Sequence, residues 1–261
     1  MKILVFIKQV PDTINVRIDP KTGNLDRTGL KGVINPFDNN ALEAALKIKE
    51  ETGATITVVS MGPPQTEESL RIALAMGCDE AVILCAKELG GADTLATGYT
   101  LASAVKKIED YDLLLFGRHA VDADTGQCGP IVAEFLNLPQ ITFATSIKVE
   151  ENHVICERDF DDCIQKVKVK LPAVVTVCAE INEPRYPSPL GIMKAMKKPL
   201  ITWTHEDMGC DTERIGKNGS PSIVREIFEP EHTQKDTIMF SGETDEIAKS
   251  IVDLLEQQHL I

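Results

Sequence analysis

The residues best suited to bind a ligand lie between positions 117 and 127. An apolar run, YDLLLFG, ends at Gly117, and the loop RHAVDADTGQCGP then leads into a helix expected over residues 125–136. Backbone N–H groups at a helix start, together with the Thr125 hydroxyl and the Gln127 amide, can hold a phosphate or pyrophosphate. Arg118 would add positive charge. This loop is therefore predicted to bind a nucleotide.

Two acidic residues in the same loop have two possible roles. Asp122 or Asp124 could accept hydrogen bonds from ribose hydroxyls, or Asp124 could simply cap the following helix. A second loop, GGADTLAT at 90–97, repeats the design with small residues followed by Thr94 and Thr97, one helical turn apart. It can form a second anion site or an ordinary glycine turn with a cap.

The familiar catalytic motifs are missing from the sequence. There is no G-x-G-x-x-G after the first strand, no G-x-x-x-x-G-K-[ST] and no G-x-S-x-G. His119 is close to Asp122 but has no nucleophile beside it, so a surface histidine is favoured. Cys128 lies at a helix start, where its pKa could be lowered, although a small packed thiol next to a ligand is favoured. The five histidines lack metal-ligand spacing. The chain is expected to have a nucleotide site, no catalytic residue and no metal.

Alternating strands and helices must position these loops. Apolar β-branched runs predict strands, and apolar residues at helical spacing predict helices. The expected strands are 3–7, 54–60, 80–85, 111–117 and 173–177, and the expected helices are 66–76, 92–108, 125–136, about 192–198 and 244–257, with one more introduced by Asn35-Pro36-Phe37-Asp38 and capped by Asp38 or Asn39. This order predicts a doubly wound, mostly parallel Rossmann-like α/β sheet with right-handed crossovers. Ligands bind at the carboxyl ends of such strands.

The pattern changes twice along the chain. Segments 142–149, 153–159 and 164–171 alternate in polarity and predict a small antiparallel meander. After Pro199 the sheet periodicity ends, and residues 207–225 are rich in Gly, Asp and Ser. We expect a nucleotide-binding core over residues 1–200 and a C-terminal arm with a helix over 201–261. The arm would pack on a partner subunit or on the chain itself.

Composition narrows the class of protein. The net charge of -13 and the pI of about 4.9 disfavour nucleic acid and anionic membrane surfaces as partners. No stretch is long and apolar enough to span a bilayer, and MKILVFIKQV lacks the features of a signal peptide. The seven scattered cysteines form no C-x-x-C pair, which favours reduced thiols. A cytoplasmic location is expected.

The segment LPAVVTVCAEINEPRYPSPLGIMKA at 171–195 has the pattern of a docking element. A buried strand runs into a loop stiffened by Pro184 and Pro187 and then into a short basic helix. An ordinary strand-to-helix loop is the alternative. The wording of this segment closely resembles the signature of the electron-transfer flavoprotein β subunit. The resemblance extends to KQVPD at 8–12, NPFD at 35–38, MGPPQ at 61–65, ALAMGCD at 73–79, the DADTGQCGP loop and MKAMKKP at 193–199.

The resemblance implies a partner α subunit, FAD chemistry and electron exchange with dehydrogenases. It also implies that an adenine nucleotide lies along the strand-end loops already identified. Both arguments together give the expected cofactor-binding residues Phe6, Asn35, Asp38, Ser60, Met61, Asp93, Thr94, Thr97, Gly117, Arg118, Val121, Asp122, Asp124, Thr125, Gly126, Gln127, Cys128, Gly129 and Pro130. The family further implies that the 171–195 segment recognises the partner dehydrogenase through Pro187, Ser188, Pro189, Leu190, Ile192 and Met193.

Two subtypes of the family differ in the nucleotide held. Housekeeping members hold structural AMP, whereas bifurcating members hold a second FAD that takes a hydride from NADH. GGADTLAT, the compact DADTGQCGP loop and the tail residues Trp203-Thr204 and 219–222 resemble the bifurcating type. That type implies electron transfer to the α-subunit FAD, an acyl-CoA-type dehydrogenase, and ferredoxin or flavodoxin. AMP binding is the alternative. A nucleotide-hydrolysing or adenylating enzyme is a third, disfavoured by KQVPD after the first strand.

One position departs from the family pattern. Many members have Leu-Pro-Gly-Ile-Met in the docking segment, where the leucine anchors the partner. Here the order is Pro189-Leu190-Gly191-Ile192-Met193. Either Pro189 or Leu190 is therefore expected to be the anchor, and the sequence leaves the choice open.

Overall fold

The computed structural model describes residues 1–12, 17–18, 25–26, 32–160, 162–225 and 237–261. The chain divides into two compact units, Met1–Arg225 and Glu226–Ile261. The first unit contains the central sheet and all of the expected ligand-binding residues. The second contains the helix α6 (Thr244–Gln257).

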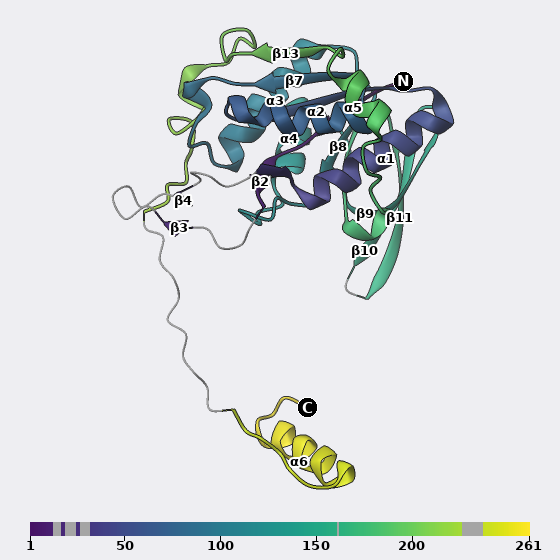
Figure 1. The fold of residues 1–261 in the computed structure, drawn as a ribbon, viewed down its shortest axis with the longest axis vertical. Coiled ribbons are helices and arrows are strands. Elements are labelled where there is room, and N and C mark those ends of the chain that lie inside the picture. Colours follow the sequence, from purple (N-terminus) through teal and green to yellow (C-terminus); the bar gives the residue numbers. More distant parts are fainter. Residues whose placement is uncertain (13–16, 19–24, 27–31, 161, 226–236) are drawn as a thin grey trace. The chain divides into compact units, whose positions relative to one another are not determined.

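Nine strands form the central sheet (Figure 1). They are β1 (Lys2–Phe6), β6 (Thr55–Met61), β7 (Glu80–Leu84), β8 (Leu113–Gly117), β9 (Gln140–Glu150), β10 (His153–Phe160), β11 (Cys163–Lys170), β12 (Ala173–Val177) and β13 (Leu200–Trp203). Their order is β11-β10-β9-β12-β8-β1-β6-β7-β13. Short strands β2 (Gln9–Pro11) and β5 (Gly32–Ile34) pair with each other, as do β3 (Arg17–Ile18) and β4 (Leu25–Asp26).

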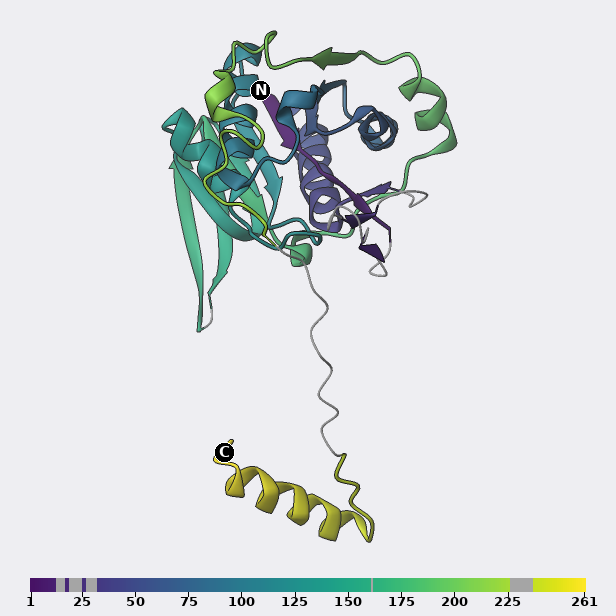
Figure 2. The same cartoon turned by 90° about the vertical axis from the view of Figure 1, so that its left-hand side faces the viewer.

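Helices cover both faces of this sheet, as Figures 1 and 2 show. They are α1 (Pro36–Thr52), α2 (Glu67–Met76), α3 (Thr94–Ile108), α4 (Cys128–Leu136) and α5 (Pro189–Ala195). Successive side chains of β1 point to opposite faces. Ile3 and Val5 pack with residues of α1 and α2, whereas Leu4 and Phe6 pack with residues of α3 and α4. Burial on both faces explains the continuous apolar run of this strand, and the predicted doubly wound α/β fold is confirmed.

The predicted antiparallel meander is also present, but it continues the main sheet. β9 pairs antiparallel with β10 and parallel with β12, with Ile141 opposite Val175. One side of the meander packs on the core through partly buried Ile147, Val149, Val167 and Val169. The parallel and antiparallel parts therefore share one hydrogen-bonded sheet.

The prediction that sheet periodicity ends at Pro199 was wrong. β13 extends the sheet by pairing parallel with β7, so that Leu200 lies opposite Ala81. β13 is an edge strand with only four residues, which gives too short a pattern to recognise in the sequence. Met208 and Ile215 are buried in the same apolar cluster as α3 and α4. Residues 200–225 thus lie with the first unit.

No helix within the described ranges is both long enough and apolar enough to cross a lipid bilayer.

Candidate functional site

The expected ligand-binding loops meet at the point where the strand order reverses. β6 and β7 lie on one side of β1, and β8 and β12 lie on the other. Phe6, the last residue of β1, is in register with Phe116 of β8 and Val59 of β6. The carboxyl ends of these parallel strands therefore form one edge, and such a reversal is where open α/β sheets bind ligands.

Asn35 joins three segments at this edge. Its side chain is fully buried; Nδ2 donates to the His119 carbonyl at 2.8 Å, and Oδ1 accepts from the Val121 N–H at 3.1 Å. Its backbone N–H donates to the Lys8 carbonyl at 2.9 Å. Both ends of the Asn35 amide are occupied by the protein, so this residue fixes the shape of the candidate ligand-binding loop.

Asp38 lies in the first turn of α1, against the end of β8. Helix α1 begins at Pro36, so the prediction that Asp38 or Asn39 caps it was wrong; Asn35 occupies the cap position. The Asp38 carboxylate accepts from the Lys8 N–H at 2.7 Å. A Cβ on Gly117 would lie 2.3 Å from Asp38 Oδ1, so only glycine permits this close packing.

Burial controls the charge of Asp38. Burial raises its pKa to about 7, although hydrogen bonds from Asn35 and from the backbone N–H groups of Lys8 and Gly117 act in the opposite direction. A carboxyl group with this pKa changes its charge in the neutral pH range. Such perturbed groups concentrate at functional sites, which supports the assignment of this edge as the candidate site.

Lys8 is a cation at this site that the list of expected residues did not include. Its Nζ lies 2.6 Å from Asp122 Oδ1, and the Asp122 side chain is only 13% exposed. The signal in the sequence was the position of Lys8 directly after the first strand, in KQVPD. Lys8 and Asp122 therefore form a charge pair beside the loop.

The loop after β8 is held by several further contacts. His119 Nε2 is 3.3 Å from Asp124 Oδ1, and the His119 ring packs on Phe37 at 4.3 Å between centroids. The Arg118 guanidinium lies 5.0 Å from the centre of the Phe143 ring, and its side chain reaches solvent. Asp124 has a positive φ of 49°. Val121, Asp124 and Thr125 are exposed and are therefore accessible to a ligand.

Helix α4 begins at Cys128, three residues later than predicted. Thr125, Gly126 and Gln127 consequently lie in the loop. The N–H groups of Cys128 and Gly129 begin the helix, whereas Pro130 has none. Gly129 is buried against the sheet, where an added Cβ would lie 2.7 Å from Thr176 Cγ2. The predicted phosphate site would thus be built from loop side chains more than from a helix start.

The possibility that the helix start lowers the Cys128 pKa was wrong. Burial raises the pKa of the Cys128 thiol, which outweighs the nearby charge of Lys8. A thiol with a raised pKa is a poor nucleophile. Cys128 is therefore a packing residue beside the site, in agreement with the alternative that the sequence favoured.

The two loops followed by helices touch each other. Thr94 Oγ1 donates to Gln127 Oε1 at 2.8 Å, which ties the start of α3 to the loop before α4. Thr97 lies one turn further along α3 and is half-buried. The structure thus brings the two predicted anion-binding loops together.

Asp93 has most of its hydrogen-bonding capacity satisfied within the protein. Its carboxylate accepts from the N–H groups of Leu95 and Ala96 at 2.9 and 3.1 Å, and from the N–H and hydroxyl of Ser222 at 3.1 and 2.8 Å. Its own N–H donates to Ser220 Oγ. Burial acts to raise the pKa of Asp93, but these hydrogen bonds prevail and lower it. Asp93 caps α3 and fastens residues 220–222 over the helix start.

Three of the expected residues form the buried wall of the site. Phe6 stacks on Phe116 with 4.2 Å between ring centroids, and Ser60 Oγ donates to the Ile7 carbonyl at 2.7 Å. Met61 is partly buried at the end of β6. The Ser60 hydroxyl is committed to the protein, so it stiffens the wall.

The docking segment is exposed and begins a short helix. Ser188 caps α5 by accepting from the Gly191 N–H at 3.0 Å, and Pro189 occupies the first helical position. The helix was expected near residues 192–198 but spans 189–195, because this cap fixes its start. Leu190, Ile192 and Met193 are 59%, 54% and 70% exposed. Pro187 is half-buried, and Ser188 and Pro189 are exposed.

Helix α1 anchors the loop that leads into α5. Arg185 donates to Glu43 at 2.7 and 2.9 Å and also pairs with Glu50. Asn40 and Asn182 exchange hydrogen bonds near the same end of the loop. No local pattern in the sequence marks Arg185, because its partners lie more than 130 residues away. The same helix therefore presents Asp38 to the candidate site and holds the docking loop.

Comparison with known proteins gives a consistent result. Residues 22–208 match the electron transfer flavoprotein domain. The chain is 45% identical to the caffeyl-CoA reductase-Etf complex subunit CarD of Acetobacterium woodii, over all of both chains. It is 44% identical to the electron transfer flavoprotein subunit beta of Thermoanaerobacterium thermosaccharolyticum and 38% identical to the acryloyl-CoA reductase electron transfer subunit gamma of Anaerotignum propionicum, again over both full lengths.

Proposed function

Because this chain belongs to the electron transfer flavoprotein β-subunit family, we propose that it is the β subunit of an NADH-linked, electron-bifurcating member with two FAD groups. A FAD bound at the β1/β8 edge would accept a hydride from NADH and pass electrons to the α-subunit FAD and to a low-potential carrier, ferredoxin or flavodoxin. The α-subunit FAD would in turn serve an acyl-CoA-type dehydrogenase. The chain contributes binding and positioning, since flavin chemistry belongs to the cofactor.

The observation that carries the proposal is that three segments converge at one edge of the sheet in a member of this family. They are the segment after β1 that begins with Lys8, the loop at 90–97 and the loop at 117–127. The residues there fit the pyrophosphate of a dinucleotide. Arg118 would supply positive charge and Thr125 a hydroxyl donor, whereas the Lys8 ammonium is paired with Asp122 and the Thr94 hydroxyl already donates to Gln127. Gly117 keeps the backbone free of side chains where α1 meets the loop. Asn35 fixes the loop from below, so the site is preorganised.

The proposed partners fit two surfaces of the chain. The exposed apolar residues of α5 would contact the dehydrogenase. Helix α6 carries exposed apolar residues such as Ile251 and Val252 and contains no buried residue, so we propose that α6 packs on the α subunit. The relative in Acetobacterium woodii is named as part of a caffeyl-CoA reductase-Etf complex, which supports a reductase as the kind of partner.

One observation favours the alternative of structural AMP. The Asp93 carboxylate already accepts from two N–H groups in the first turn of α3, those of Leu95 and Ala96. That helix start therefore offers fewer donors to a second phosphate than the sequence suggested. A mononucleotide, with a single phosphate, needs fewer donors than FAD.

Flavin counting and NADH reduction distinguish the two subtypes. The chain would be co-expressed with its α subunit, and nucleotides released by denaturation would be quantified. Two FAD per heterodimer with rapid bleaching by NADH is the expected result. One FAD with one AMP and no response to NADH would replace the proposal with the housekeeping subtype.

A further inference from the structure

Two segments that are far apart in the sequence meet at helix α5. The first is ALAMGCD at 73–79, at the end of α2, and the second is GIMKAMKKP at 191–199. Neither segment contributes to the nucleotide site. Side chains and backbone atoms of the two segments contact each other. We call residues 71–79 the α2 seat.

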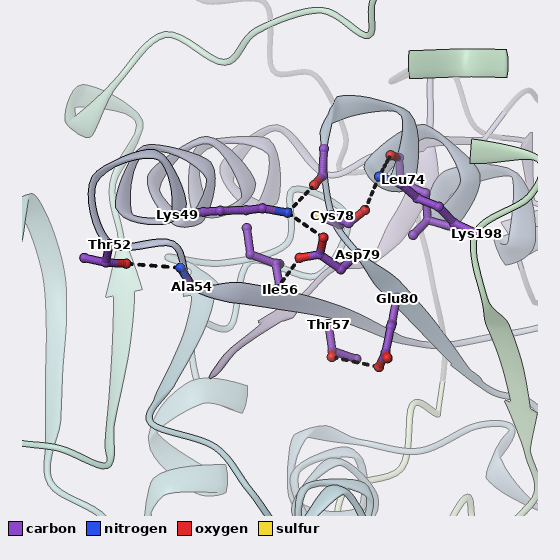
Figure 3. Close-up of polar contacts among 11 residues, drawn as sticks. Lys49, Thr52, Ala54, Ile56, Thr57, Leu74, Cys78, Asp79, Glu80 and Lys198 are labelled. Atoms are coloured by element: carbon purple, nitrogen blue, oxygen red, sulfur yellow. Dashed lines mark hydrogen bonds and ion pairs between the residues drawn. The ribbon is translucent and has the colours of Figure 1, made fainter. Parts of the chain in front are cut away.

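Lys198 binds the carboxyl end of α2. Its Nζ donates to the carbonyls of Leu74, at 3.0 Å, and Cys78 (Figure 3). The last carbonyls of a helix have no partner within the helix, so a cation there is favourable. Burial lowers the pKa of Lys198, as expected for an ammonium group removed from water against backbone.

Arg71 makes the reciprocal contact from α2. Its Nη1 donates to the carbonyls of Ala195 and Lys198 at 3.0 and 3.2 Å, at the end of α5. The Arg71 side chain is also held by Glu67, one turn earlier on α2. A cation on α2 therefore binds the end of α5, and a cation three residues beyond α5 binds the end of α2.

Gly191 sets how closely the two helices approach. A Cβ at this position would lie 2.2 Å from the Ala75 carbonyl oxygen, a backbone atom that cannot move aside alone. Ala195, the one buried residue of α5, is 2% exposed. Helix α5 has so few apolar contacts of its own that these polar contacts decide where it lies.

The α2 seat is itself fixed to the core, as Figure 3 shows. Lys49 of α1 donates to the Gly77 carbonyl at 3.1 Å and to Asp79 Oδ1 at 2.6 Å. Asp79 Oδ2 accepts from the Ile56 N–H of β6 at 2.8 Å. The seat is thus tied to a helix and a strand of the main sheet.

We propose that the α2 seat orients helix α5 for partner recognition, with Arg71, Gly191 and Lys198 as positioning residues. An isolated helix of seven residues is unstable in water, so α5 depends on the seat for its order. The direction in which Leu190, Ile192 and Met193 point is then set by residues that never touch the partner. This inference rests on the proposed docking function.

The test compares Lys198→Met with Lys197→Met in the purified heterodimer. Both changes remove one positive charge, but Lys197 is exposed and lies beside the contact. The probe is an acyl-CoA dehydrogenase that accepts electrons from the wild-type heterodimer. We expect K198M to raise the KM for the dehydrogenase about tenfold, with kcat changed less than about twofold. The KM of K197M for the dehydrogenase and its thermal midpoint should match those of the wild type. Dye reduction by every variant should also match the wild type.

Gly191→Ala keeps the inference testable if K198M folds poorly, and it is expected to raise the same KM. Hydrogen exchange at residues 189–195 should accelerate in both variants and remain unchanged in K197M. Wild-type KM values in K198M and G191A, alongside a raised KM in the double variant Leu190→Ala/Ile192→Ala, would overturn the positioning role. A wild-type KM in this double variant, or a wild-type heterodimer from which no acyl-CoA dehydrogenase accepts electrons, would instead remove the docking function. In that case, unchanged hydrogen exchange in K198M and G191A would still reject the role of the α2 seat in ordering α5.

Discussion

At the scale of single residues, Asp38 links the stability of the fold to pH. Its pKa is raised to about 7 in the folded chain from 3.8 in the absence of burial. The stability contributed by the protonated form is therefore fully present below pH 3.8. Between pH 3.8 and 7 the unfolded chain loses this proton first, so stability falls as pH rises, by at most about 1.4 kcal/mol per pH unit.

Asp38→Asn should remove this pH dependence, because an amide does not titrate. The free energy of unfolding of the chain without its α subunit would be measured with urea from pH 5 to pH 8. We expect the wild type to lose roughly 2 kcal/mol relative to D38N across this range. Parallel curves for the two proteins would show that Asp38 does not titrate there.

Asp124 and Thr125 provide the direct test of the ligand-binding loop. Asp124→Asn is preferred to alanine because asparagine tolerates the positive φ of 49°. The double variant D124N/T125V should weaken nucleotide binding about tenfold. Both side chains are exposed, so the unfolding midpoint should remain near that of the wild type. The nucleotide retained per heterodimer after dialysis is the measurement.

Asp110→Asn is the matched control, since Asp110 is an exposed carboxylate outside the loop. Equal nucleotide retention in D124N/T125V and D110N would place the site elsewhere.

At the scale of elements, α1 contacts both candidate functional regions of the first unit. Its first turn carries Asp38 to the candidate site, and Asn40, Glu43 and Glu50 hold the docking loop. A helix is stiff over this length, so the relative position of site and loop is fixed by a single element. Of the two carboxylates that pair with Arg185, Glu43 is the buried one, because its side chain is 4% exposed.

Arg185→Met should destabilise the first unit by about 2 kcal/mol, because it leaves Glu43 buried without its cation. This value is below that for a fully buried ion pair, since Arg185 is one-third exposed. Glu50→Gln removes only an exposed partner and should produce no measurable change. Urea unfolding of R185M, E43Q and R185M/E43Q gives the coupling energy. Additive effects of the two single changes would mean that the pair contributes nothing of its own.

At the scale of the whole molecule, the chain has two units that differ in how far their apolar residues are buried. The first unit has a double-sided core that runs through to Ile215. The second unit contains α6, in which no residue is buried. Apolar side chains such as Ile251 and Val252 remain exposed on it. An amphipathic helix in this condition gains stability by packing on another surface.

A chain truncated after Arg225 should therefore fold but assemble poorly. We expect its unfolding midpoint to match that of the full-length chain, because the removed residues form a separate unit. Its affinity for the α subunit should fall at least about tenfold. Sedimentation of the mixed subunits is the measurement. Normal assembly of the truncated chain would assign the α-subunit interface to the first unit alone.

The sequence by itself determined the order of elements, the class of fold and the loops that could bind a ligand. Those properties depend on local periodicity and turn residues, which a chain displays without its partners. The runs at 3–7 and 173–177 were recognisable because strands buried on both faces are continuously apolar. The prolines of the 171–195 segment and its resemblance to the family signature predicted a docking role, which stays a prediction.

Only the tertiary structure decided what each polar side chain at the site does. Asn35 is occupied by His119 and Val121, Asp93 by Ser222, and Lys8 by Asp122. The chain segments in these pairs are separated by 84 to 129 positions, which no local pattern can report. The contacts of the α2 seat are equally non-local, and β13 adds a pattern of only four residues to the same difficulty. Pairing with β7 and contact with α5 exist only after the sheet has assembled, because they are made between backbones that the fold brings together.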